Sequence, residues 1–83
     1  MKRDINAIVT MLATQCMINL GEIPDPVNGD VAVYLDKAEV FIDLLDVLRS
    51  KTTGNLSPEE DDFLREVLSN IRAVYEKKGA RRT

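Results

Sequence analysis

The chain has 83 residues, a formal net charge of −3 and an isoelectric point near 4.8. It contains one cysteine, Cys16, and no histidine, which excludes an intrachain disulfide and leaves too few ligands for a structural zinc site. A negative net charge disfavours a general nucleic-acid binder, which needs a positive field over one face. A domain this short buries only about 60–65% of its unfolded surface, so it needs either efficient packing or a partner chain.

The first predicted element is a helix over about residues 3–20. Its main apolar stripe has the three- and four-residue spacing of an amphipathic helix and consists of Ile5, Ile8, Val9, Leu12, Cys16 and Leu20. Ala7, Met11 and Ile18 lie outside this stripe, so we expect the helix to be covered on more than one side. No small residue precedes Cys16 as a cleavage site requires, and no segment reaches the roughly 20 apolar residues of a membrane span. We therefore expect a cytoplasmic protein that does not contact a membrane.

A loop and a second helix follow. The loop, GEIPDPVNGD at residues 21–30, contains two prolines and two glycines and cannot be helical. The helix is predicted over about residues 31–51, or from nearer Tyr34, because Val31 and Val33 are poor helix starters. One apolar stripe contains Tyr34, Ala38, Phe41, Ile42, Leu45 and Leu48, and a second beside it contains Val33, Val40, Leu44 and Val47. Two stripes predict a helix in the centre of the fold.

The stretch KTTGNLSPEEDD, residues 51–62, is interpreted as a turn at 52–57 between two helices. Gly54 supplies a left-handed residue, and Ser57, Pro58 and Glu60 form a capping box with proline at the first helical position. A phosphate cradle or a calcium loop is disfavoured, because the four consecutive acids repel phosphate and point around a helix. Whether the acidic run Glu59–Asp62 has a role beyond structure stays open.

The third helix is predicted over about residues 58–78, ended by Gly79 and followed by a frayed tail at 79–83. Its apolar face contains Phe63, Leu64, Val67, Leu68, Ile71, Val74 and Tyr75. The short connector predicts that helices two and three form a long antiparallel hairpin, with helix one packed across it. The predicted fold class is therefore all-α, with three helices in a single domain.

The acids Asp36, Glu39, Asp43 and Asp46 form a stripe along the second helix. A metal site or a general-acid pair needs carboxylates from different helices to converge. We favour a solvated face, with Arg72 near Glu39 and Arg65 near Asp46 across the hairpin. A role for Asp43 beyond structure stays open.

Two further polar features occur on the first helix. Gln15 and Asn19, four residues apart, are expected to make an interhelical hydrogen bond, although they could instead line a small-ligand pocket. Cys16 lies on the main apolar stripe without a basic neighbour in sequence, so we expect a small core residue rather than a nucleophile. We assign no catalytic residue, no metal ligand and no cofactor.

Several segments together resemble the bacterial domain-of-unknown-function family 1844. They are LATQ at 12–15, LGEIPDP at 20–26, IDLLDVL at 42–48 and KTTGNLSPEE at 51–60, closing on Tyr75. The resemblance covers about Val9 to Glu76. Where the family tends to place an acid before the leucine that opens the second helix, this chain has Tyr34 before Leu35. The resemblance implies a bacterial, cytosolic, all-helical protein, and it implies no activity or cofactor.

These observations favour a non-enzymatic helical module that associates with itself, as a two-fold homodimer, or with another protein. The candidate interface residues are Ile8, Met11, Leu12, Ile18 and Phe41. The alternative is a pocket between helices that binds a small ligand or a partner's amphipathic helix.

Overall fold

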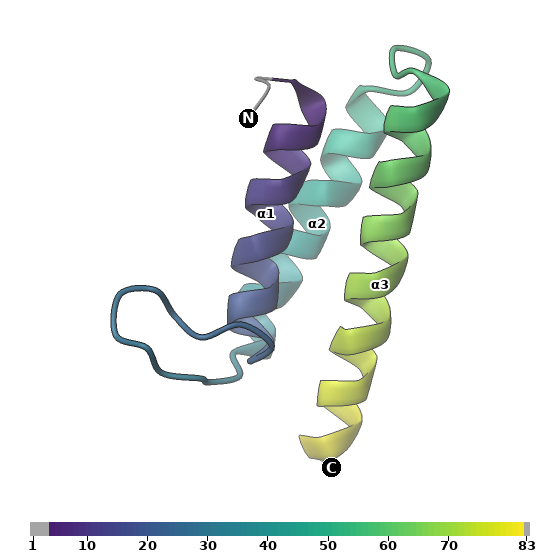
Figure 1. Ribbon diagram of the computed structural model, residues 1–83. Helices are drawn as coiled ribbons and strands as arrows, with labels where there is room; N and C mark the ends of the chain where they lie inside the picture. Colours follow the sequence, from purple (N-terminus) through teal and green to yellow (C-terminus); the bar gives the residue numbers. More distant parts are fainter. Residues whose placement is uncertain (1–3, 83) are drawn as a thin grey trace.

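The computed structural model describes residues 4–82, with side chains up to Gly79, and contains three helices (Figure 1). They are α1 (Ile5–Asn19), α2 (Leu35–Lys51) and α3 (Pro58–Arg82), and the described residues contain no strand. The predicted all-α fold class with three helices is confirmed. The predicted start of helix one at residue 3, and the end of the tail at Thr83, lie outside the described residues.

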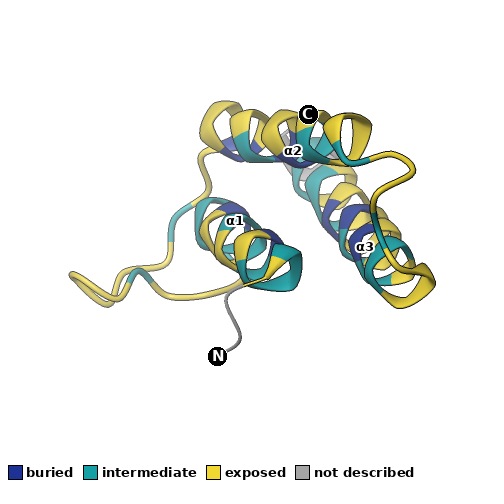
Figure 2. Cartoon of the chain, turned by 90° about the horizontal axis from the view of Figure 1, so that it is seen from above, coloured by how far each residue is buried: buried dark blue, intermediate teal, exposed yellow. Residues whose placement is uncertain are grey.

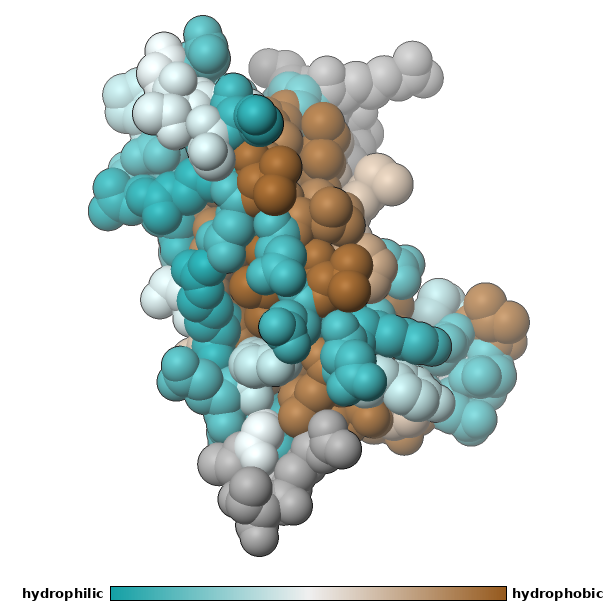
Figure 3. All heavy atoms as spheres, turned by 180° about the vertical axis from the view of Figure 1, so that it is seen from behind, coloured by the Kyte–Doolittle hydropathy of each residue, from teal (hydrophilic) through white to brown (hydrophobic). Residues whose placement is uncertain are grey.

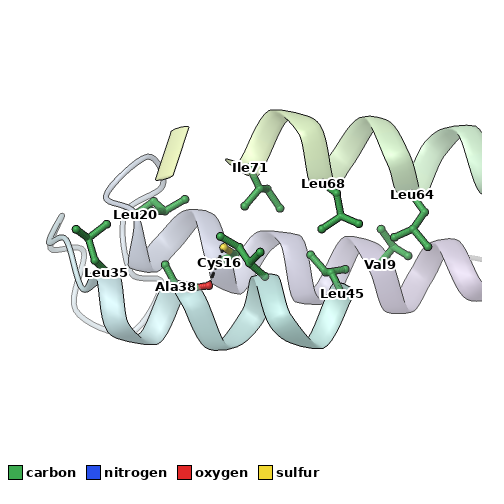
Figure 4. Close-up of a cluster of buried hydrophobic side chains, with 10 residues drawn as sticks. Val9, Cys16, Leu20, Leu35, Ala38, Leu45, Leu64, Leu68 and Ile71 are labelled. Carbon is green, nitrogen blue, oxygen red and sulfur yellow. Dashed lines mark hydrogen bonds between the residues drawn. The ribbon is translucent and has the colours of Figure 1, made fainter. Parts of the chain in front are cut away.

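Each helix contacts the other two, and the view along the bundle shows them at the corners of a triangle (Figure 2). α2 and α3 run in opposite directions on either side of the turn that joins them (Figure 1). All three helices contribute to one apolar core, whose side chains point toward one another (Figure 4). Its buried members are Val9, Cys16, Leu20, Leu35, Ala38, Ile42, Leu45, Leu64, Leu68 and Ile71.

Both ends of α1 are capped. Asp4 accepts a hydrogen bond on Oδ1 from the Ala7 amide at 3.2 Å, as an N-cap residue does. At the other end Gly21 has a φ of 76°. The Gly21 amide donates to the Ile18 carbonyl at 3.1 Å and the Glu22 amide to the Met17 carbonyl at 3.0 Å. This pair of bonds is a Schellman motif, which turns the chain sharply out of the helix.

α2 begins at Leu35 with Tyr34 as its N-cap residue, so the predicted start near Tyr34 is confirmed and the one at residue 31 is wrong. Residues 31–34 instead return alongside the end of α1, where the Tyr34 amide donates to the Asn19 carbonyl at 2.6 Å. The returning chain lies so close to Gly21 that a Cβ there would be 2.9 Å from Val33 Cγ2. These long-range contacts hold Val31 and Val33 out of the helix, which neither residue favours starting.

α3 continues through Gly79 to Arg82, beyond the predicted end at residue 78. Glycine costs a helix interior only about 1 kcal/mol, which tertiary contacts can offset. An ion pair holds this segment beside the rest of the fold, with Lys78 Nζ 3.2 Å from Glu22 Oε1. Gly79 also passes close to α2, since a Cβ added to it would lie 4.0 Å from Leu35 Cδ1.

The turn between α2 and α3 contains a left-handed glycine and a reciprocal cap. Gly54 has a φ of 84°. The Glu60 amide donates to Ser57 Oγ at 3.2 Å, and the Ser57 amide donates to Glu60 Oε1 at 2.8 Å. These two bonds are those of a capping box, and Pro58 takes the first helical position, where no amide proton is needed.

Ser57→Ala is expected to lower the free energy of unfolding by about 1 kcal/mol, because the substitution leaves the Glu60 amide without its acceptor. The midpoint of urea unfolding measures this loss. Ser57→Asp is the matched control, since aspartate also caps helices and should retain most of the stability. An unchanged midpoint for Ser57→Ala would show that this hydrogen bond does not stabilise α3.

Candidate interaction face

The acidic stripe on α2 lies beside α3, but its partners differ from those predicted. Arg72 pairs with Asp46 rather than Glu39, while Glu39 Oε2 accepts a hydrogen bond from the Tyr75 hydroxyl at 3.3 Å. Arg65 pairs with Asp61 of its own helix at 3.5 Å rather than with Asp46. Both observed partners on α3, Tyr75 for Glu39 and Arg72 for Asp46, lie further from the turn than an even count of residues outward from it places them.

The amides on α1 also differ from expectation. The Asn19 side chain donates to the Gln15 carbonyl of its own helix at 3.0 Å, so the hydrogen bond is intrahelical. At this end α1 is joined to the start of α2 by the Asn19 carbonyl, which accepts a hydrogen bond from the Tyr34 amide. The Gln15 side chain is exposed. The main chain of Asn19 thus helps to hold the two ends of the loop together.

Cys16 is fully buried in the core, and its Sγ donates a hydrogen bond to the Ala38 carbonyl at 3.4 Å (Figure 4). Burial disfavours the thiolate and raises the pKa of Cys16 from 9.0 to about 11. A thiol with this pKa is almost wholly protonated at neutral pH, so it is a poor nucleophile. The contact with Ala38 joins α1 to α2.

The most prominent surface feature is an apolar area where α1 and α2 lie side by side. We define the α1–α2 face by five exposed apolar side chains, Ile8, Met11, Val40, Leu44 and Val47, which are between 44 and 68% exposed. Figure 3 shows apolar side chains in a continuous band over this side of the molecule, bordered by hydrophilic residues. A contiguous apolar band rimmed by polar groups is typical of a protein interaction site.

The structure distributes the predicted interface residues over three environments. Ile8 and Met11 are exposed on the α1–α2 face. Leu12 and Phe41 are half-buried beneath it, packed against the core. Ile18 lies on another side, in a hollow of about 330 Å³ that it shares with Asn19, Val31 and Tyr34. This hollow lies between α1 and the loop, not between two helices.

Val40, Leu44 and Val47 were missing from the predicted interface. They belong to the second apolar stripe of α2, and the two stripes together predicted a helix in the centre of the fold. α1 and α3 instead both pack over the first stripe, where Ala38, Ile42 and Leu45 are buried, and they leave the second exposed. The signal was present in the sequence, but residues 4–82 form only three helices and none of them covers that stripe.

The fold and this face together define a small all-α domain with an unpaired apolar surface. Residues 2–77 match the family described as Domain of unknown function (DUF1844). The chain belongs to this family, as the resemblance of its motifs indicated. No curated protein and no solved structure matches the chain.

None of the helices within residues 4–82 is both long and apolar enough to cross a membrane. Over residues 4–82, no group of three or more histidine, cysteine, aspartate or glutamate side chains is placed to hold a metal ion.

Proposed function

We propose that this protein is a non-enzymatic helical interaction module that forms a homodimer through the α1–α2 face. The observation that carries the proposal is the exposure of five apolar side chains on two helices in contact, Ile8 and Met11 on α1 and Val40, Leu44 and Val47 on α2, together with the apolar band of Figure 3. Removal of such side chains from water is the main favourable term in protein association. A second copy of the chain is always available to supply the matching apolar surface.

The size of the face suits a modest interface. The five side chains expose an apolar area on the order of 500 Å², at the upper end of what a monomer usually leaves uncovered. A standard interface buries about 800 Å² on each partner, including a polar rim. The half-buried Leu12 and Phe41 and the charged border of α2 lie next to the face and would supply the remainder.

Size exclusion coupled to light scattering, from micromolar to hundreds of micromolar protein, tests the proposal. We expect the mass of a dimer at the higher concentrations. Leu44→Glu and Met11→Glu should each weaken the dimer by about thirtyfold or more, near 2 kcal/mol, because each would bury a charge without a partner. Both side chains are exposed in the single chain, so the circular dichroism spectrum should not change.

Ala73→Glu is the matched control, since Ala73 is exposed on α3, which contributes no residue to the face, and lies in a hollow with Arg49 and Arg72. This variant should dimerise as the unmodified chain does. A monomer at every concentration would contradict the proposal and favour a different protein as the occupant of the face. Equal weakening by Ala73→Glu would show that added negative charge, and not the α1–α2 face, controls association.

A further inference from the structure

The loop between α1 and α2 is a projecting arm with its own bracing. It leaves the bundle sideways, on the side where α1 and α2 meet, and stands out beyond the α1–α2 face (Figures 1 and 2). Its tip is a closed turn, in which the Asp25 amide donates to the Asp30 carbonyl at 2.9 Å and the Gly29 amide to the Asp25 carbonyl at 2.7 Å. Asp25 Oδ1 also accepts from the Val27 amide at 2.8 Å.

The base of the arm is also held by specific contacts. The Asn19–Tyr34 main-chain bond and the close approach of Val33 to Gly21 join its two ends. Lys78 pairs with Glu22 and ties the arm to α3. The tip nevertheless carries Val27, which is 92% exposed, and Val31 follows it at 60%. A braced arm that holds apolar side chains in water is preorganised for contact with another surface.

We infer that the arm of each protomer lies against the α1 of the other, in a two-fold dimer whose α2 helices run antiparallel. This inference rests on the proposed dimer and specifies its arrangement. The arm projects from one end of the face, so it would extend alongside the partner when the two faces meet. In the antiparallel arrangement that end faces the amino-terminal half of the partner's α1, where Ile8 is exposed. Val27 would cover it.

Charge favours the same arrangement. Asp25 and Asp30 on the arm and Asp36 in the first turn of α2 lie at one end of the bundle, whereas Arg49 and Lys51 lie in the last turn of α2 at the other end. Lys37, at the acidic end, lies over the Tyr34 ring at 4.8 Å. Antiparallel helices place each acidic end beside a basic end. Parallel helices would bring both acidic arms together, and like charges in proximity oppose association.

Crosslinking of single cysteine variants by a short bis-maleimide tests the arrangement. A mixture of Val27→Cys and Ile8→Cys should crosslink as a heterodimer, while neither variant should crosslink alone. Leu44→Cys, close to the predicted two-fold axis, should crosslink with itself. The unmodified chain is the control, because its only thiol, Cys16, is buried. Crosslinking of Val27→Cys with itself would indicate parallel helices and overturn the inference.

A second variant separates the arm from the face. Val27→Asp should weaken the dimer by about tenfold and leave the circular dichroism spectrum unchanged, since the side chain is free of contacts in the single chain. Ala73→Asp is the matched control. A dimer of unchanged affinity in Val27→Asp would overturn the role of the arm while leaving the proposed dimer intact. An unmodified chain that is monomeric throughout would overturn both.

Discussion

Leu45→Ala is expected to lower the free energy of unfolding by about 3–4 kcal/mol, within the range for a buried leucine that leaves a cavity. Leu45 is completely buried and faces Leu68 and Val9, so atoms from all three helices would lose contacts (Figure 4). A domain of this length has roughly 4–12 kcal/mol of stability in total. The substitution should therefore lower the melting temperature by about 15 °C or more.

Leu44→Ala is the matched control, because the neighbouring leucine is on the α1–α2 face and 44% exposed. Urea unfolding at low and high protein concentration separates the two roles. The loss from Leu45→Ala should be nearly the same at both concentrations. Leu44→Ala should cost little at low concentration and more at high concentration, where the dimer adds stability by mass action. Equal losses from the two variants at low concentration would contradict the division of α2 into a buried and an exposed stripe.

The helices could be predicted from the sequence because their signals are local. The apolar spacing of α1 and α3, and the Ser57–Glu60 capping box, each lie within a few residues of one another. The local signal at the start of α2 leaves two choices, residue 31 and Tyr34, and long-range contacts favour the later one. Val33 and Tyr34 are held outside the helix by Gly21 and Asn19, which lie more than ten residues earlier in the chain.

The candidate interaction face shows a different limit of sequence reasoning. Both stripes of α2 are visible as a pattern, but the pattern does not say which one the other helices cover. The choice depends on the angle at which α1 and α3 pack, which in turn depends on the Schellman motif after α1 and the turn at Gly54. The expected Arg72–Glu39 pair also depends on how α2 and α3 are placed against each other, and Arg72 pairs with Asp46 instead.

Gly21 joins the fold to the arm, and Gly21→Ala is expected to lower the free energy of unfolding by about 2–3 kcal/mol. Two effects contribute. Its φ of 76° is left-handed, where alanine is less stable than glycine by about 1 kcal/mol. Its new Cβ would also lie 2.9 Å from Val33 Cγ2 and 3.3 Å from the Ala32 carbonyl oxygen. The valine side chain can turn away, but the carbonyl can move only with the main chain.

Gly29→Ala isolates the first effect, because Gly29 has nearly the same φ, 75°, and open space where a Cβ would be. It should cost only about 1 kcal/mol. The difference between the losses of stability of the two variants therefore measures the cost of the contact with Ala32 and Val33 at the base of the arm. Equal losses would mean that the returning chain shifts freely, and the arm would then lack a fixed base. With a fixed base, Gly21→Ala should displace the arm and weaken the dimer as well as the fold. Gly29→Ala should not move the base, because nothing surrounds the new methyl group.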